Sequence, residues 1–502
     1  MQRLTKIALA LSLPIAVTGC PDPGDNETNA DETGAEETSV TNAETTLPST
    51  MSATTATTNM TSTTDSETMT DSATTDPDTT DTDPDTGSTT EPPMNCASAD
   101  DPAAPKMEVA TPITTDTTLT CDTVWVLTEA TYVQGAVLTI EPGTSVVGQS
   151  GSALVIDTDA RLEAAGTEDY PIIFTSAQPK GSRARADWGG VVLLGLGEVN
   201  LPNGVGLAEG FADPPDYGGN DTAHDCGTLT YVRVEWAGFQ LVMDSELNAI
   251  TWYGCGTDTT VDHVQAHMGS DDGFEAFGGG FDMRYMIASG GSDDCFDLDL
   301  GYNGSIQYAV CYQDPADTDA NHGLEWSNGP MDFTAEPLTS PSIANMTFVG
   351  QGAGGNAGKS IGFNFKQGTE ANVYNSYFTN VSGPGATFQD EQTIAVAEDM
   401  RIVVEGAVWN DHQPFGHQGA GPYSWTDMQW QDFILDQDGN QDGVDLGIDA
   451  TWPTPSFKPN AMAAGAGVAP SAEFDATTYV GAVDPDAADD WTAAGWINYA
   501  ID

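Results

Sequence analysis

One acidic motif occurs twice within a short stretch of this sequence. Gly-Ser-Asp-Asp begins at Gly269 and again at Gly291, an offset of 291 − 269 = 22 residues, and each copy continues towards a Phe and a further acid. Carboxylates gathered in this way need a neutralising partner: a shared proton creates an acid catalyst, whereas a divalent cation creates a binding site. The carboxylates concerned are Asp271, Asp272 and Glu275 in the first copy, and Asp293, Asp294, Asp297 and Asp299 in the second.

The surrounding segments indicate how the motif is positioned. From Val124 onward, short runs rich in β-branched residues, such as AVLTIEPGT and YPIIFTS, alternate with Gly, Asn and Asp. This pattern favours strands joined by tight corners, and the return of the motif after one such interval favours a solenoid of parallel strands. Because neighbouring strands lie about 4.8 Å apart, we expect the acids of the two copies to be neighbours, with Glu275 beside Asp297.

Several segments resemble a widespread group of bacterial secreted proteins and lipoproteins. These segments are LTIEPGT, LEAAGTEDYPIIFTS, DWGG, YVRVEWAG, SDDGFEAFGG, DDCFDLDLGY and the terminal YVGAV and WTAAGW. The resemblance covers roughly residues 121–502 and implies an all-β fold, a right-handed parallel β-helix of the pectin-lyase type. On this basis we expect a β-helix domain over residues 95–424 and a less regular region, 425–502, that packs on the β-helix or caps it.

A narrower resemblance, to polygalacturonases, concerns four short motifs. That family carries Asn-Thr-Asp, Asp-Asp-Cys, Gly-His-Gly and Arg-Ile-Lys in this order, and the chain has SDDG, DDC, NHG and NFK in the same order, with Ser270 and Asn364 departing from the family pattern. The resemblance implies a hydrolase of acidic polysaccharide. The implied roles are general acid for Asp293, activation of water for Asp272 and Asp294, tuning of the acid for His322, and binding of an anionic sugar for Lys366.

Calcium is the cofactor that the acids predict most directly, because it takes six to eight oxygen ligands. All seven carboxylates of the repeated motif are candidate ligands. A second candidate is the segment DGNQDGVDLGID, which has the spacing of an EF-hand-type loop with Gly443 at the sharp turn; a solvated acidic loop is the alternative. The ligands of this loop would be Asp438, Asn440, Asp442 and Asp449.

Two further sets of residues have both a functional and a structural interpretation. His263 and His267 lie four apart, so on a regular strand they would share a face, either bridged by a metal or as ordinary ladder residues. Four aromatic residues suit either a platform for sugar rings or the core between coils, and we expect the core. They are Trp236, Trp252, Trp326 and Tyr302.

The N-terminal residues indicate export. Arg3 and Lys6 precede an apolar run, and Val-Thr-Gly-Cys ending at Cys20 resembles the bacterial lipobox. We expect residues 1–20 to be a lipoprotein signal peptide and Cys20 to carry the lipid that anchors the chain to a membrane, at the outer membrane or cell surface. Residues 21–94 are low in complexity and rich in Thr, Ser, Asp, Glu and Pro, which predicts a disordered tether.

Charge and cysteine content narrow the partners and the compartment. The chain has 13 Lys and Arg against 76 Asp and Glu, a formal net charge of −63, and this field repels nucleic acid. Besides Cys20, six cysteines remain in an oxidising compartment, which favours three disulfides. We expect sequence neighbours to pair, as Cys96–Cys121, Cys226–Cys255 and Cys295–Cys311.

Together these features predict a calcium-stabilised β-helix lipoprotein at the cell surface that binds polysaccharide or extracellular matrix. The first alternative is a polysaccharide-degrading enzyme, either the hydrolase described above or a lyase that uses calcium and a basic residue such as Arg284. The second is a purely structural surface protein.

Overall fold

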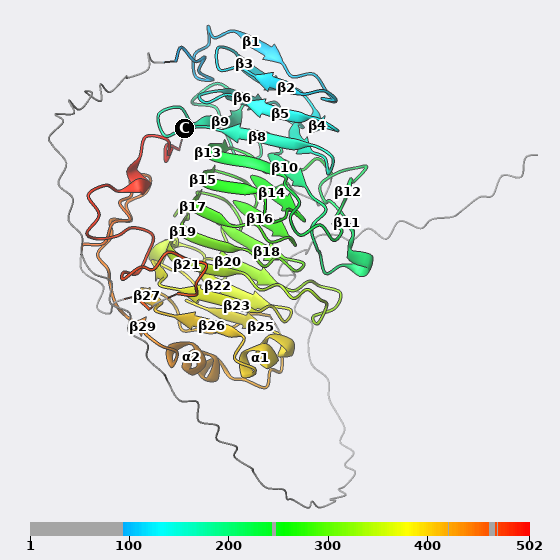
Figure 1. Ribbon diagram of the computed structural model, residues 1–502. Coiled ribbons are helices and arrows are strands. Elements are labelled where there is room, and N and C mark those ends of the chain that lie inside the picture. Colours follow the sequence, from blue (N-terminus) through cyan, green and yellow to red (C-terminus); the bar gives the residue numbers. More distant parts are fainter. Residues whose placement is uncertain (1–93, 243–246, 420, 461–466, 469, 502) are drawn as a thin grey trace, which may run out of the picture. The chain divides into compact units, whose positions relative to one another are not determined.

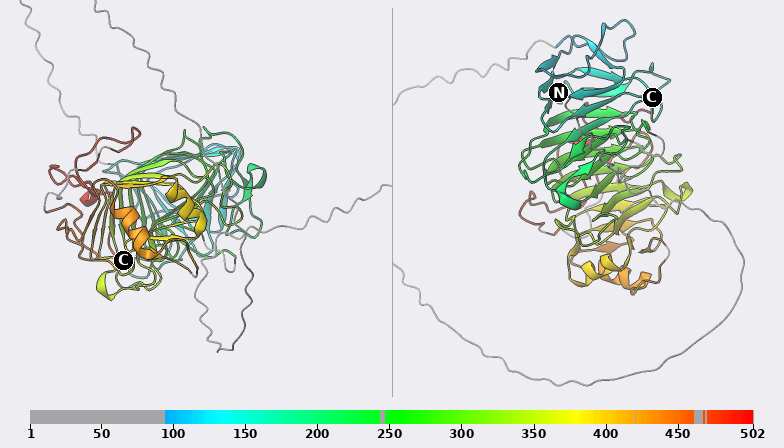
Figure 2. Two further views of the ribbon diagram at one scale, coloured as in Figure 1. Left: turned by 90° about the horizontal axis from the view of Figure 1, so that it is seen from below. Right: turned by 90° about the vertical axis from the view of Figure 1, so that its right-hand side faces the viewer.

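The computed structural model describes residues 94–502 except 243–246, 420, 461–466, 469 and 502. The expected signal peptide, Cys20 and the tether up to residue 93 therefore lie outside the described residues. Within the described part, successive coils stack along one axis to form a parallel β-helix, closed at its C-terminal end by two helices (Figures 1 and 2). No helix in this part is both long enough and apolar enough to cross a bilayer.

The larger of the two main sheets, sheet A, contains 17 strands. Every pairing within it is parallel, as a right-handed succession of coils requires. Its strands are β1 (Lys106–Glu108), β2 (Thr117–Leu119), β3 (Val124–Leu127), β5 (Val137–Ile140), β6 (Ser145–Gly148), β8 (Arg161–Ala165), β9 (Ile172–Ser176), β13 (Gly227–Glu235), β15 (Thr260–His267), β17 (Met283–Ser289), β19 (Ser305–Tyr312), β21 (Ser342–Val349), β23 (Ala371–Tyr374), β24 (Tyr377–Thr379), β26 (Ile402–Glu405), β27 (Val408–Asn410) and β29 (Gln441–Asp442).

Sheet B contains ten strands, which follow one another in sequence order with one strand from each coil. These strands are β4 (Ala130–Val133), β7 (Ala153–Ile156), β10 (Val191–Leu194), β14 (Ile250–Tyr253), β16 (Phe274–Phe277), β18 (Phe296–Asp299), β20 (His322–Ser327), β22 (Ile361–Lys366), β25 (Thr387–Gln389) and β28 (Gly416–His417). The remaining elements are the antiparallel pair β11 (Gly206–Leu207) and β12 (Asp216–Tyr217), helices α1 (Glu391–Glu398) and α2 (Asp427–Leu435), and three short 3₁₀ turns at Pro202–Gly204, Gly352–Gly354 and Trp491–Ala493.

The long strands of sheet A bend at one residue in each coil. The bend residues of β13, β15 and β17 are Tyr231, His263 and Tyr285, and each has a positive φ, between 48° and 55°. A positive φ is unusual for a side chain of this size, and here it recurs at the same place in each coil. The rings stack, with centroids 4.3 Å apart for both Tyr231–His263 and His263–Tyr285. Stacking along the axis therefore accompanies the corner that gives each coil its shape.

The interior of the β-helix is filled by apolar side chains from both sheets, which form one continuous core. Phe274 and Phe296, one coil apart, stack with ring centroids at 5.2 Å, as do Trp326 and Phe365. The four aromatic residues that the sequence offered as a sugar platform are all buried, which agrees with the core interpretation: Trp236, Trp252, Trp326 and Tyr302.

The C-terminal region begins at the end of the solenoid and then returns along it. α2 lies next to β28 at that end, and β29 adds one more parallel pairing to β27. The chain then runs back over the outer face of sheet A, where Phe457 and Trp496 pack against Ile287 and Tyr312 (Figure 1). An apolar outer face on sheet A thus explains why this region packs on the coils.

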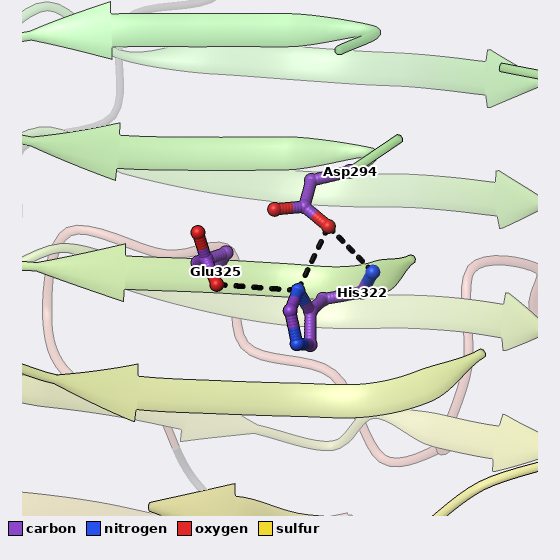
Figure 3. Close-up of side chains that lie close together, drawn as sticks. All are labelled: Asp294, His322 and Glu325. Atoms are coloured by element: carbon purple, nitrogen blue, oxygen red, sulfur yellow. Dashed lines mark hydrogen bonds and ion pairs between the residues drawn. The ribbon is translucent and has the colours of Figure 1, made fainter. Parts of the chain in front are cut away.

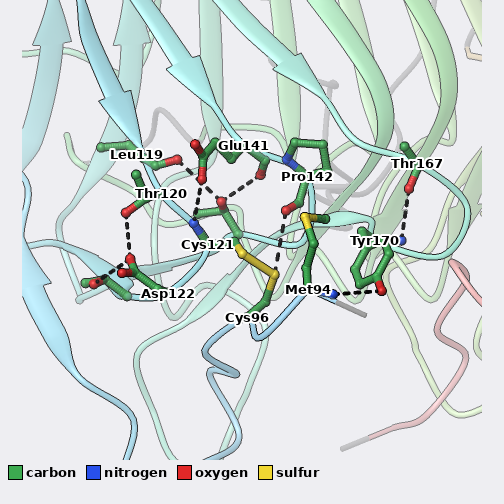
Figure 4. The surroundings of a disulfide bond; sticks show 12 residues. Met94, Cys96, Leu119, Thr120, Cys121, Asp122, Glu141, Pro142, Thr167 and Tyr170 are labelled. Carbon is green, nitrogen blue, oxygen red and sulfur yellow. Dashed lines mark hydrogen bonds between the residues drawn. A yellow bond between two sulfur atoms is a disulfide. The ribbon is translucent and has the colours of Figure 1, made fainter. Parts of the chain in front are cut away.

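The three expected disulfides are all present. Cys226–Cys255 and Cys295–Cys311 each join positions whose Cα atoms are 5.7 Å apart. Cys96–Cys121 ties the first described residues to the residues that precede β3, next to a hydrogen bond of 3.0 Å from Met94 N to the Tyr170 hydroxyl (Figure 4). Each disulfide therefore links chain segments that the solenoid already holds side by side.

Candidate functional site: an acidic ladder on sheet B

The two Gly-Ser-Asp-Asp copies occupy equivalent corners of successive coils, just before β16 and β18. The Asp272 Oδ1 atom accepts the backbone N–H of Asp294 at 2.9 Å, and Asp294 Oδ1 accepts the N–H of His322 at 2.5 Å. One coil earlier, Asn248 Oδ1 accepts the N–H of Asp272 at 3.2 Å. Each of these side chains therefore supplies the acceptor that an N–H of the next corner needs, which gives Asp272 and Asp294 a structural role whatever else they do.

A second row of polar side chains runs across the strands of sheet B. The strand register pairs Glu275 with Asp297, Asp297 with Glu325, and Glu325 with Asn364. The 22-residue offset therefore predicts the neighbouring pair Glu275–Asp297 correctly. We call this row, with the corner acids Asp271, Asp272, Asp293 and Asp294, the acidic ladder.

The C-terminal half of the acidic ladder contains its own cations, of which Figure 3 draws His322. His322 Nδ1 lies 2.9 Å from Asp294 Oδ1 and 3.3 Å from Glu325 Oε1, and its Nε2 lies 3.0 Å from Gln418 Oε1. Lys366 Nζ forms an ion pair with Glu325 Oε2, and both side chains are more than nine-tenths buried, at 8% and 9% exposed. These contacts place two positive groups against two carboxylates.

The protonation of this half follows from those contacts. Burial opposes the charge on His322, but the carboxylates of Asp294 and Glu325 outweigh it and raise the pKa of His322 to about 9. Burial likewise opposes the charge on Glu325, but Lys366 and His322 outweigh it and lower the pKa of Glu325 to about 2. His322 is therefore an imidazolium that donates from both ring nitrogens at neutral pH, and Glu325 is a carboxylate.

In the N-terminal half of the acidic ladder, carboxylates predominate over cations. The charges of His322 and Lys366 lower the pKa values of Asp293 and Asp297, respectively, but burial and the neighbouring carboxylates outweigh them. The carboxylates form two groups of three. Within each group, one oxygen from each carboxylate lies within 4.8 Å of the corresponding oxygens of the other two, and Asp272 belongs to both groups. The groups are Asp271, Asp272 and Asp293, and Asp272, Glu275 and Asp297.

Electrostatics in this half favour neutralisation. Burial, followed by the charges of Asp294 and Asp271, raises the pKa of Asp272 well above its usual value. Burial, followed by the neighbouring carboxylates, similarly raises the pKa values of Glu275, Asp293 and Asp297. Asp297 Oδ1 is buried and has no hydrogen-bond partner among the described residues. A proton or a cation would satisfy this oxygen.

The donor set fits calcium. Calcium binds carboxylate oxygens at about 2.3–2.6 Å, so two ligands on opposite sides of one ion lie roughly 5 Å apart, and the 4.8 Å limit within each group is compatible with one bridging ion. Asp272 and Glu275 are buried, whereas Asp271, Asp293 and Asp297 are partly exposed. Water can therefore supply further ligands from the exposed side.

Asp299 lies apart from both groups. Its Oδ1 atom accepts the N–H of Leu300 at 2.6 Å, and burial raises its pKa to about 6 although hydrogen bonds to Ser327 and Leu300 lower it. It belongs to neither group of converging oxygens. We therefore leave Asp299 out of the site that the geometry supports.

The candidate ligand atoms of the EF-hand-type segment do not converge on one point. Asn440 Oδ1 accepts the N–H of Ala407 at 2.8 Å, Asp442 Oδ1 lies 2.9 Å from His412 Nε2, and Asp449 Oδ1 accepts the N–H of Thr451 at 3.1 Å. Asp438, Asp442 and Asp449 form no group of converging oxygens among the described residues. The spacing of the motif assumes one continuous loop, but Gln441–Asp442 is strand β29.

His263 and His267 do not face each other either. The positive φ of His263 interrupts the alternation of the strand, so its ring stacks between Tyr231 and Tyr285. His267 is buried, with Nδ1 2.9 Å from Ser289 Oγ and Nε2 2.9 Å from Ala500 O. Burial lowers the pKa of His267, which is consistent with a neutral ring bonded on both nitrogens. The structure therefore supports the ladder interpretation of these two residues.

Three functional neighbours escaped the sequence analysis. Glu325 lies three residues after His322, and its alternation within HGLEWS places it on the outer face of the strand. Asn248 precedes Asp272 by 272 − 248 = 24 residues, close to the period of the motif. The contact of Gln418 with His322 could not be predicted from the sequence, because the two residues are 96 positions apart.

Comparison with known proteins returned one match. The family model described as a pectate-lyase like beta helix domain matches residues 111–448. Neither the curated proteins nor the solved structures gave a match. The matched range includes the whole acidic ladder and all but the first of sheet A's strands.

Proposed function

Because the chain belongs to the pectate-lyase-like β-helix family, we propose that it is a calcium-stabilised polysaccharide-binding protein held at a bacterial cell surface by a lipid on Cys20. Calcium would bind in the N-terminal half of the acidic ladder, and the surface around it would hold the glycan. The anchor rests on the lipobox-like sequence alone. Polysaccharide as the ligand rests on the family and on the surface location that this anchor implies.

One observation carries the calcium part of the proposal: Asp272 joins two groups of three converging carboxylates, and burial raises the pKa values of their members Asp272, Glu275, Asp293 and Asp297. Where the same ladder continues, His322 and Lys366 supply the positive charge. Desolvated carboxylates at this distance repel one another unless they bind protons or a cation. A divalent ion removes this repulsion at neutral pH, and would fasten two successive coils together.

Calcium would also account for glycan binding by so acidic a chain. With a net charge of −63 the protein repels an acidic polysaccharide, but a cation shared between protein and glycan carboxylates would reverse the local interaction. Asp271, Asp293 and Asp297 are partly exposed, so an ion bound there would remain accessible from solvent.

The test is retention of the chain on immobilised glycans, with calcium or with a chelator. We expect retention on at least one acidic polysaccharide in calcium, its loss in chelator, and its loss in Asp297→Asn. Asp442→Asn is a matched control, because Asp442 belongs to neither carboxylate group, and it should bind as the wild type does. Retention that is the same with calcium and with chelator, and the same in the wild type and in Asp297→Asn, would contradict the proposal.

Hydrolysis of acidic polysaccharide is the second candidate, and the position of Asp293 favours it. Asp293 is partly exposed, and burial and the charge of Asp294 raise its pKa, as a general acid requires. Two observations weigh against this candidate. Lys366 is engaged with Glu325, and the oxygens of Asp272 and Asp293 approach within 4.8 Å, whereas inverting enzymes separate their carboxyls by about 6.5–9.5 Å.

Digestion of polygalacturonate separates the two candidates. A hydrolase would release new reducing ends, and Asp293→Asn would abolish them. If the protein only binds glycan, no reducing ends appear with the wild type.

A further inference from the structure

A cavity on the outer face of sheet A brings together three distant parts of the chain. It is lined by Ser98 to Asp100, by strands β6, β9 and β13, by the loop containing Lys180 and Arg183, and by Asn498 and Ala500. Its volume is about 60 Å³, room for roughly four water molecules. The C-terminal segment reaches the level of β9 (Figure 1), and its residues Asn498 and Ala500 line the cavity.

Positive charge is concentrated in the lining. Of the 13 Lys and Arg in the chain, Lys180, Arg183 and Arg233 all line this one cavity. Two carboxylates line it as well, Asp100 and Glu235, so the formal charge of the lining is 3 − 2 = +1. At physiological ionic strength the Debye length is about 8 Å, so most of the remote acids are screened and these nearest charges dominate.

The guanidinium groups of Arg183 and Arg233 are fixed by hydrogen bonds, and each still has N–H donors that these bonds do not use. Arg183 Nη2 binds Asp100 Oδ1 at 2.6 Å, and its side chain is only 7% exposed. Arg233 donates from Nε to Glu235 Oε1 at 3.0 Å and from Nη1 to Trp496 O at 2.8 Å. Each guanidinium has five N–H donors, so both retain donors beyond these contacts. The rigid, preformed arrangement lowers the entropy that an incoming anion must lose.

Two hydroxyls in the lining provide an independent indication of a ligand. Ser145 is 3% exposed and lines the cavity together with Thr175, whose buried hydroxyl has no hydrogen-bond partner among the described residues. Ser145 on β6 pairs with Ile173 on β9, and Ile173 pairs with Arg233 on β13, so the three residues follow one another across the sheet. A buried hydroxyl beside guanidinium groups is a donor for an oxygen-bearing anion.

We propose that this cavity binds one oxyanion group: a carboxylate, sulfate or phosphate. Arg183, Arg233 and Lys180 supply its charge-assisted hydrogen bonds, and the Ser145 hydroxyl supplies a neutral one. Bound there, the anion joins the residues after Cys96, the loop around Lys180 and the C-terminal segment. This site lies on sheet A and does not depend on the glycan-binding proposal for sheet B.

Calorimetric titration of the mature chain in chloride buffer of constant ionic strength tests the proposal. The probes are sulfate, phosphate and galacturonate, which distinguish a free mineral anion from the carboxylate of an acidic sugar. We expect saturable binding of at least one probe, with one site per chain. Loss of one charge-assisted hydrogen bond should weaken binding about ten- to a hundredfold in Arg233→Gln.

Further variants keep the result interpretable if Arg233→Gln fails to fold. Lys180 is 56% exposed, so Lys180→Gln should fold normally, and Ser145→Ala removes only a hydroxyl; both should weaken binding. Arg401→Gln is the matched control, because Arg401 pairs with Glu370 away from the cavity, and it should bind as the wild type does. Absence of binding by all three probes, or equal binding in Lys180→Gln and Ser145→Ala, would overturn the proposal.

Discussion

The carboxylate of Asp272 accepts the backbone N–H of Asp294, one coil further along the solenoid, at 2.9 Å. The same carboxylate belongs to both groups of converging acids. Asp272 therefore has a structural function, in which any acceptor would serve, and a proposed ion-binding function, in which charge is required. Two substitutions separate these functions.

Asp272→Ala and Asp272→Asn should differ in stability. Alanine leaves the buried N–H of Asp294 without its acceptor, which costs about 1–3 kcal/mol. Asparagine keeps a carbonyl oxygen, and Asn248 already fills this role at the preceding corner. In chelator, urea unfolding should show Asp272→Ala less stable than Asp272→Asn. Equal destabilisation would mean that the corner hydrogen bond does not matter.

The buried pair of Glu325 and Lys366 yields a second prediction. Lys366→Met leaves the buried Glu325 carboxylate with only His322 and the Asn364 amide as partners, and breaking a buried pair costs about 3–5 kcal/mol. Adding Glu325→Gln removes the uncompensated charge, so the double variant should recover part of this loss in a denaturant titration. A double variant less stable than Lys366→Met would show that the two residues are not coupled in this way.

His322 should make the stability depend on pH. Its pKa is raised to about 9 in the folded protein, from about 6.5 in an unfolded chain. A raised pKa means that the folded state binds the proton more tightly, so the contribution is complete below about pH 6.5 and is lost as the pH rises through about 9.

Unfolding free energies measured from pH 6 to pH 10 provide the check, with His322→Gln as the comparison. The wild type should lose stability over this range relative to His322→Gln, because glutamine does not titrate. Parallel curves for the two proteins would indicate that His322 is neutral in the folded state.

The sequence predicted the fold and much of the ladder because both follow from a period. An offset of 22 residues places Glu275 beside Asp297 through simple strand register. The disulfides were predicted by pairing cysteines that are neighbours in sequence, and this rule holds at separations of 25, 29 and 16 residues. Features that repeat with the coil are therefore visible in the sequence.

Features that break the period were not visible. Lys366 reaches Glu325 across 41 residues, because the intervening coil carries a long loop. The C-terminal segment meets β15 through two hydrogen bonds between Gln265 and Asn498, which are 233 residues apart. The EF-hand spacing likewise did not reveal that β29 interrupts the segment or that Asn440 accepts the backbone N–H of Ala407.

The central claim, that a cation neutralises the N-terminal half of the acidic ladder, is tested most directly by calcium titration of chelator-treated protein, read by calorimetry and by the melting midpoint. The account predicts saturable calcium binding and a higher midpoint, because calcium at 100 times its Kd adds about 2.7 kcal/mol. Asp297→Asn should lose both effects and Asp442→Asn should keep them. A midpoint that calcium leaves unchanged, or calcium binding that survives Asp297→Asn and disappears in Asp442→Asn, would contradict the account.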